Sequence, residues 1–179
     1  MAWSAPMTAV ANSTFTAAQF NEFVRDNLNE TAPAKSTGAS GYFVGDAVNS
    51  IVERRAISAA DLTAGTTAST TYTDLTGSGI GPTITVDTGP AALIIVRCSA
   101  ENTGGGSSRM AYTVSGATSI AAADNRGVGF FGAAGGNINA SDVSLVSALT
   151  PGSNTFTARY RVSSGTGTFS SRRIIVLPF

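Results

Sequence analysis

Histidine is absent from this 179-residue chain, and cysteine and lysine occur once each, at positions 98 and 35. Without histidine, the commonest metal ligand and general base is missing. A single cysteine can form neither a disulfide within one chain nor a thiolate zinc site. The sequence therefore predicts no cofactor and no metal site, and it argues against enzymes that need a nucleophile beside a base.

Charge is also scarce. Only 12% of the residues are charged, and 11 basic residues balance 11 acidic ones, whereas soluble proteins average about 25%. A neutral, charge-poor chain has no electrostatic means of gripping nucleic acid or an anionic membrane. A soluble monomer of this size normally carries a net charge of about 2 to 8. We therefore expect a subunit that covers much of its surface in an assembly.

No apolar run approaches the roughly 20 residues of a membrane span, and the first basic residue is Arg25. A secretory signal would begin with a charged segment ahead of an apolar one. We expect neither a membrane span nor a secretory signal.

Helical spacing is clearest near the start of the chain. Thr16 and Gln19 have the pattern of a capping box, and Phe15 and Phe20 that of a hydrophobic staple. The apolar residues at helical spacing are Phe20, Phe23, Val24 and Leu28. They predict a helix over Ala17–Glu30, limited by the later Pro33. Such a short helix is marginal by itself, so its stripe must pack on something.

The arm before this helix holds the only tryptophan, Trp3. Trp3 either folds back onto the apolar stripe of the helix, or the arm and the helix together bind another protein. Arm and helix form a first segment, residues 1–34. Residues 35–69 then read as a short β-hairpin, with strands at 41–44 and 49–57 and a turn around Gly45-Asp46, followed by a Gly/Ser/Ala/Thr-rich connector.

Alternation of apolar and polar residues marks the remainder, residues 70–179. Residues 155–162 and 109–114 alternate clearly, shorter runs occur at 71–75, 83–86 and 143–145, and Gly- and Pro-rich turns separate them. This pattern predicts a mainly β protein, an antiparallel jelly-roll β-sandwich preceded by an N-terminal arm and one amphipathic helix. Cys98 reads as a small core residue, and the glycines at 127 and 129 as parts of a turn.

Two segments, residues 92–96 and 174–177, are apolar at successive positions. Such strands are covered on both faces, here by the sandwich core inside and a neighbouring subunit outside. Either Ile174 and Val176 or Ile175 and Leu177 would face outward. The candidate subunit interface is Arg173, Ile174, Ile175, Val176 and Leu177. The basic doublets Arg54-Arg55 and Arg172-Arg173 predict ion pairs or hydrogen bonds with acidic residues rather than a basic patch.

A glycosidase would need two carboxylates at catalytic distance. The few candidates lie near expected strand ends, where acidic residues usually serve turns: Asp74, Asp87, Glu101, Asp124 and Asp142. We expect a protein that is not an enzyme.

Longer motifs carry a resemblance. The chain opens with Trp3-x-x-Pro-Met-Thr-x-Val-x-Asn and continues with Phe15-Thr-Ala-Ala-Gln-Phe-Asn-x-x-Val-Arg-Asp-Asn-Leu-Asn-Glu. Together with Gly41-Tyr-Phe-Val and Ile51-Val-Glu-Arg, these motifs resemble the opening of virion proteins of tailed phages that infect actinobacteria. The ending, from Leu149 through Gly165-Thr-Gly-Thr to Arg173-Ile-Ile-Val-Leu-Pro, is similar to the closing hairpin of the trimeric, tumour-necrosis-factor-like jelly rolls of phage fibres and decorations. Residues 56–148 carry no such resemblance.

The resemblance implies a virion structural subunit, made in the host cytoplasm and displayed on the particle surface as a homotrimer. Its arm and helix would anchor it to another virion protein through six side chains: Trp3, Phe15, Phe20, Phe23, Val24 and Leu28. A minor tail, fibre or baseplate component and a capsid decoration or head fibre both remain open. A third reading is a module that binds host-surface carbohydrate through loop residues Phe130, Phe131 and Asn137.

Overall fold

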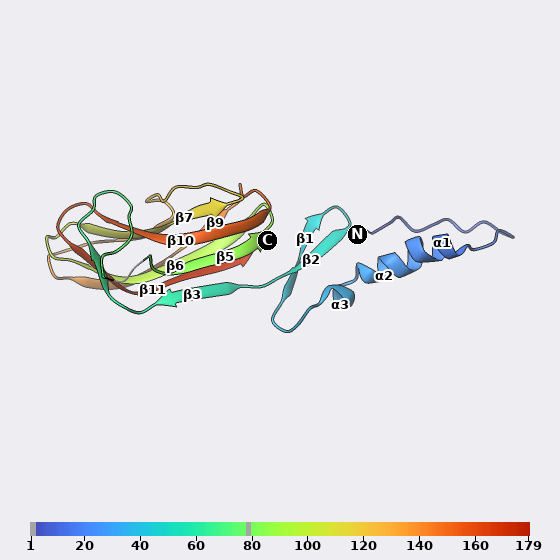
Figure 1. The fold of residues 1–179 in the computed structure, drawn as a ribbon, viewed down its shortest axis with the longest axis horizontal. Coiled ribbons are helices and arrows are strands. Elements are labelled where there is room, and N and C mark those ends of the chain that lie inside the picture. The colour runs from blue at the N-terminus through green and yellow to red at the C-terminus, as the bar shows by residue number, and fades with distance from the viewer. Residues whose placement is uncertain (1–2, 78–79) are drawn as a thin grey trace. The chain divides into compact units, whose positions relative to one another are not determined.

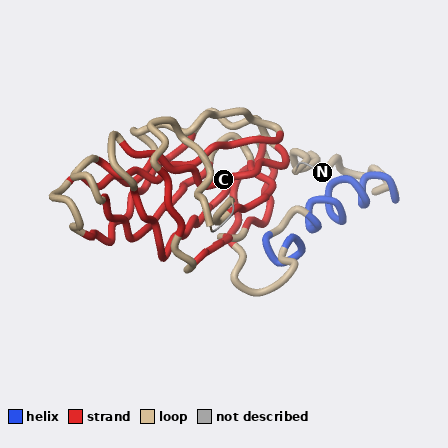
Figure 2. The backbone as a smooth tube through the Cα atoms, turned by 60° about the vertical axis from the view of Figure 1, so that its left-hand side comes forward, coloured by secondary structure: helices blue, strands red, loops and turns tan. Residues whose placement is uncertain are grey.

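The computed structural model describes residues 3–77 and 80–179. The chain forms two compact units, one that ends at Arg55 and one that comprises Ala56–Pro178 (Figure 1). Among the described residues, helices occur in the first unit and strands dominate the second (Figure 2). The prediction of a mainly β protein with one N-terminal amphipathic helix is confirmed.

The N-terminal helix runs without a break through α1 (Ala17–Phe20), the π-helical η1 (Asn21–Asp26) and α2 (Asn27–Asn29). Its predicted capping box is present: the Thr16 hydroxyl accepts from the Gln19 amide at 3.2 Å, and the Thr16 amide donates to the Gln19 side chain at 3.0 Å. The rings of Phe15 and Phe20 meet edge to face at 6.1 Å. Both local signals thus fix the start of the helix as predicted.

The end of the helix differs in detail from the prediction. The helix stops at Asn29, and Pro33 lies in the first turn of a separate short helix, α3 (Ala32–Lys35). A proline is tolerated there because the amide that it lacks has no partner within a helix.

A two-stranded antiparallel hairpin follows, as predicted, formed by β1 (Tyr42–Ala47) and β2 (Ser50–Arg54). Its turn is not at Gly45-Asp46 but at Val48-Asn49, where Asn49 has φ +57°. Asparagine adopts this left-handed conformation more readily than other non-glycine residues do.

The second unit is a sandwich of two antiparallel sheets. One has the strand order β5-β10-β7-β8, and the other has the order β3-β11-β6-β9, with the short β4 also paired to β11. The bounds are β3 Ile57–Asp61, β4 Gly65–Thr67, β5 Thr83–Thr88, β6 Ala92–Asn102, β7 Ser107–Gly116, β8 Gly127–Phe131, β9 Asn137–Val146, β10 Gly152–Val162 and β11 Gly167–Pro178.

The strand pairs are nested within one another along the chain. The pair β7–β8 is innermost, β6–β9 and β5–β10 enclose it in turn, and β3–β11 is outermost. A long hairpin wound in this way into two facing sheets is a jelly roll. The predicted fold is confirmed.

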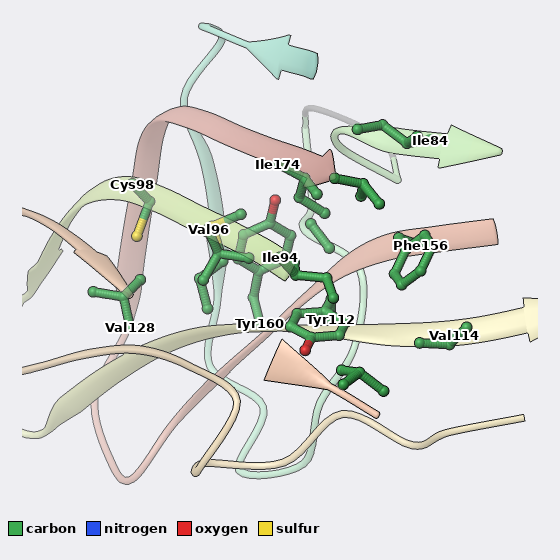
Figure 3. Packing of buried hydrophobic residues seen from close by; sticks show 14 of the residues in the cluster. Ile84, Ile94, Val96, Cys98, Tyr112, Val114, Val128, Phe156, Tyr160 and Ile174 are labelled. Atoms are coloured by element: carbon green, nitrogen blue, oxygen red, sulfur yellow. The ribbon is translucent and has the colours of Figure 1, made fainter. Parts of the chain in front are cut away.

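The core lies between the two sheets and is built from the inward positions of the alternating strands (Figure 3). Tyr160 packs on Phe169, with ring centres 5.0 Å apart, and Tyr112 packs near Phe156 at 6.2 Å. The Tyr112 hydroxyl shares a 2.8 Å hydrogen bond with Ser144, so its polar end is satisfied. Cys98 is buried in this core, as predicted.

Three segments differ from their sequence-based description. The expected connector contributes β3 and β4, which pair with β11, so the sandwich begins at Ala56 rather than at residue 70. Residues 71–75 form only a single bridge, from Thr73 to Tyr160. The expected turn at Gly127 is strand β8; a side chain at Gly127 would lie 2.3 Å from the Met110 carbonyl oxygen, so only glycine allows this close pairing.

Candidate assembly surfaces and a polar cluster

Two rows of aliphatic side chains cross the outer face of the sheet β3-β11-β6-β9. In one row, Leu93 of β6 lies between Leu177 of β11 and Leu145 of β9; in the other, Ile95 lies between Ile175 and Val143. We call these six residues the aliphatic face. Directly opposed residues on one face of a sheet pack against one another, so the six form a continuous surface.

This aliphatic face meets solvent. Leu145 and Val143 are 62% and 57% exposed, and the four residues on β6 and β11 are half-buried. The same sheet face becomes polar toward its other end, where Arg97 donates to Asn139 at 3.1 Å and Ser99 to Asn137 at 2.9 Å. An apolar patch bordered by hydrogen-bonded polar residues is typical of a protein–protein contact.

The structure separates the two alternatives for the last strand. Ile174 and Val176 are fully buried in the core of their own subunit, whereas Ile175 and Leu177 face outward beside the exposed Arg173. Ile174 and Val176 are therefore removed from the candidate interface, because they point inward and are already covered by the core of the sandwich. The interface gains Leu93 and Ile95, which belong to the run 92–96 expected to be covered on both faces, and Val143 and Leu145, which sequence reasoning did not assign to an interface.

The predicted anchor residues lie on a surface of the N-terminal unit that the unit itself does not cover. Phe20 and Leu28 are 49% and 59% exposed, Phe15 and Trp3 are also exposed, and Phe23 and Val24 are half-buried. Residues 17–26 contain no buried side chain. The helix thus leaves Phe20 and Leu28 of its apolar stripe exposed to solvent.

The arm is tied to the helix through Ser4 and Asn27. The Asn27 side chain accepts from the Ser4 amide at 2.8 Å and donates to the Ser4 carbonyl at 3.1 Å. The Trp3 amide donates to the Asn49 carbonyl at 2.7 Å, and the Trp3 side chain lines a pocket of about 510 Å³ with Glu30 and Ile51. Asn27 does not follow the apolar spacing of the helix, and the sequence gives no signal for this role.

The three residues proposed for a sugar-binding loop have three different surroundings. Phe130 packs against the core, and its ring lies so close to Gly132 that a side chain there would approach it to 2.5 Å. Phe131 is 79% exposed at the end of β8 and pairs with Ser107. Asn137 pairs with Glu101 in the other sheet and accepts from Ser99. Phe130 and Phe131 thus belong to β8 of one sheet, and Asn137 belongs to β9 of the other.

The opposite sheet, β5-β10-β7-β8, carries a charged cluster on its outer face. Arg161 donates to both carboxylate oxygens of Asp124, and the Tyr72 hydroxyl donates to the same carboxylate at 2.9 Å. Arg109 lies 3.6 Å from Asp124, and Arg159 pairs with Asp74.

These hydrogen bonds shift the pKa values of Asp124 and Tyr72. The bond from Arg161, aided by Tyr72, holds the pKa of Asp124 below its usual 3.8. Burial, together with the hydrogen bond to Asp124, raises the pKa of Tyr72 to about 12. Tyr72 is therefore a neutral hydrogen-bond donor at any physiological pH.

The basic doublets make the ion pairs that the sequence predicts. Arg55 pairs with Glu53 at 3.2 Å, and the buried Arg172 pairs with Asp61 at 2.6 Å. Within residues 3–77 and 80–179, no three His, Cys, Asp or Glu side chains gather where a metal ion could bind. No helix in that same part of the chain is long and apolar enough to cross a membrane.

Comparison with known proteins gives little beyond the fold. No family model and no curated protein matches the sequence. Among solved structures, the chain is similar to an isomalto-dextranase of Arthrobacter globiformis T6 in complex with panose, with 16% identity and a TM-score of 0.36. The match covers 70% of this chain and 24% of the dextranase chain, so this chain spans about a quarter of that protein. The likeness concerns a β-rich region and carries no functional argument.

Proposed function

We propose that this protein is a non-enzymatic structural subunit of a tailed-phage virion, a homotrimer displayed on the particle surface. The jelly roll assembles with sister copies through its aliphatic face, and the N-terminal arm and helix attach it to another virion protein. The resemblance of the opening and closing motifs supports the virion setting and the trimeric state.

The aliphatic face carries this proposal. Six aliphatic side chains in two cross-strand rows lie on the outside of a sheet whose inner side already packs the core. Full burial of one such side chain contributes about 1.5 to 3 kcal/mol relative to exposure. A second copy of this chain is the favoured occupant, because a chain with equal numbers of acidic and basic residues has no net charge to keep its copies apart.

The N-terminal unit supports the second half of the proposal. An amphipathic helix in a soluble protein normally buries its apolar side, yet Phe20 and Leu28 remain about half exposed. The capping box and the Asn27–Ser4 bonds fix the helix and arm in place before a partner binds. Such pre-organisation lowers the ordering cost of docking.

The mass of the purified protein in solution tests the assembly. Light scattering at micromolar concentration is expected to give three times the 18.0 kDa of one chain. Leu145→Glu should convert the assembly to single chains, because the new carboxylate would be buried at the contact. Ser115→Glu, at an exposed position on the opposite sheet, should leave the mass unchanged. A monomeric wild-type protein would overturn the proposal.

Placement on the particle is decided by copy number. A tail, fibre or baseplate subunit is present in few copies per virion, and a head decoration or head fibre in many. Quantitative mass spectrometry of purified particles, with the major capsid protein as the reference, separates the two.

A further inference from the structure

A pocket lies on the outer face of the sheet β5-β10-β7-β8, the sheet opposite to the aliphatic face. Its volume is about 500 Å³, within the usual range for small-molecule sites. Arg159 and Arg161 of β10 and Thr113 of β7 contribute to one side, and Tyr72, Ala121 and Ala122 come from the preceding loops. The pocket combines charged, hydroxyl and apolar groups.

The two charged side chains that line this pocket are both arginines, Arg159 and Arg161. Four arginines contact a carboxylate or a lining residue: Arg109, Arg126, Arg159 and Arg161. Asp74 and Asp124 are the two carboxylates that they share. Arg109 and Arg126 lie beside the pocket and do not line it, so each of the two lining arginines faces one of these carboxylates. Guanidinium groups bind carboxylates and phosphates through paired, parallel hydrogen bonds.

The arginines are held in position before any ligand binds. Arg161 is fixed by two bonds to Asp124, and its guanidinium lies 5.6 Å from the centre of the Tyr72 ring. Arg159 is fixed by Asp74 through one nitrogen, Nη1. A guanidinium has five N–H groups, so each arginine keeps donors beyond those that its carboxylate occupies.

The other groups of the pocket suit a sugar ring. The Tyr72 ring and the methyl groups of Ala121 and Ala122 provide apolar surface for the C–H face of a pyranose, and the Thr113 hydroxyl can exchange hydrogen bonds with ring hydroxyls. Asp74 and Asp124, which lie beside the pocket and bind its two arginines, are partly exposed and can accept hydrogen bonds from further hydroxyls. These groups suit a hydroxylated ring, and the guanidinium donors that the two carboxylates leave free suit an acidic one.

We propose that this pocket binds an acidic sugar, with the carboxylate of the sugar on Arg159 and Arg161 and the ring against Tyr72. This inference goes beyond the structural role proposed above. It also moves the carbohydrate-binding surface from Phe130, Phe131 and Asn137 to the face of β10 and β7. The aliphatic face lies on the other sheet, so the pocket stays accessible when sister copies cover that face.

Calorimetric titration of the full-length protein tests the proposal. The probes are digalacturonic acid, its dimethyl ester, which keeps the rings and removes the charge, and glucose 6-phosphate. Digalacturonic acid is expected to bind at least about tenfold more tightly than either of the other two probes. A tenfold ratio of affinities is what one charge-assisted hydrogen bond contributes. Equal binding of acid and ester, preference for the phosphate, or no binding of any probe would overturn the proposal.

Variants locate the site. Arg161→Gln and Arg159→Gln should each weaken binding of digalacturonic acid by about tenfold or more. Arg161→Lys keeps the charge but loses the paired geometry, so it should weaken binding less than Arg161→Gln does. Arg55→Gln removes an exposed arginine from the N-terminal unit and should leave binding unchanged. Unfolding temperatures and solution masses show whether each variant is folded and assembled, so loss of binding is distinguished from failure of the trimer.

Discussion

Arg172 of β11 and Asp61 of β3 lie directly opposite each other in the outermost strand pair and form a 2.6 Å ion pair. Arg172 has no exposure to solvent; it also donates to the Thr63 carbonyl at 2.7 Å and lies over the Tyr160 ring. The pair joins the first strand of the sandwich to the last. A buried arginine of this kind depends on its carboxylate, because no water is present to solvate it.

Asp61→Asn is therefore expected to destabilise the sandwich by about 3 kcal/mol, the usual cost of leaving one member of a buried pair without its partner. Urea unfolding followed by circular dichroism measures the change. Asp87→Asn makes the same substitution at an exposed position on β5 and should change stability by less than about 0.5 kcal/mol. Equal effects of the two substitutions would contradict a structural role for the Arg172–Asp61 pair.

The carboxylate of Asp124 should make part of the stability depend on pH. Its pKa is lowered in the folded protein, chiefly by the hydrogen bond from Arg161, from an ordinary value of 3.8. This contribution is fully present above the unfolded pKa and is lost as pH falls through the lower folded pKa. Asp124→Asn should therefore reduce the loss of stability between about pH 4 and pH 2, measured as the urea midpoint at each pH. An unchanged acid profile would show that the Arg161 bond is too exposed to matter.

Cys98 should be unreactive in the folded protein. Burial in the core raises the pKa of its thiol to about 12, so almost no thiolate exists at pH 8, and reagents have no access. A chromogenic disulfide reagent is expected to label the native protein only at the rate of unfolding and to label it rapidly in concentrated denaturant. Fast stoichiometric labelling without denaturant would place Cys98 at the surface instead.

The fluorescence of Trp3, the only tryptophan of the chain, reports whether the hydrogen bonds between Asn27 and Ser4 hold the arm in place. Asn27→Ala removes both hydrogen bonds to the Ser4 backbone, so the arm should detach. The Trp3 emission should then shift to longer wavelength and be quenched more strongly by acrylamide. Asn29→Ala, at an exposed position of the same helix, serves as the control and should preserve the wild-type spectrum. Identical spectra for all three proteins would mean that the arm is held by other contacts.

Sequence patterns were most informative where a local rule determines the structure. The capping box at Thr16 and the strict alternation of residues 155–162 depend on neighbours along the chain, and both correspond to observed elements. They were least informative at β3 and β4, whose Ala-, Ser-, Thr- and Gly-rich sequences resemble a linker. These segments become strands because β11 offers them a free edge, a tertiary effect that outweighs intrinsic propensity.

The candidate functional surfaces also differ in how far the sequence predicts them. The apolar run at residues 174–177 predicted a strand that is covered on both faces. Only the structure shows which side chains point outward, and these are Ile175 and Leu177. The partners on β9 gave a weaker signal, because Val143 and Leu145 belong to a short alternating run. The polar cluster gave no signal in the sequence. Tyr72 and Asp124 come from loops that are far apart along the chain, and only the tertiary fold brings them within hydrogen-bond distance.

The nested order of the strand pairs also sets a sequence of events during synthesis. The helix and the β1–β2 hairpin depend on contacts close in sequence and can form while the rest of the chain is still being made. In contrast, β3 cannot pair until β11 has been made, because Ile57 lies opposite Val176. The aliphatic face is likewise incomplete until β11 pairs with β6. The aliphatic face is therefore complete only after residues 175 and 177 of β11 have been made and have paired with β6.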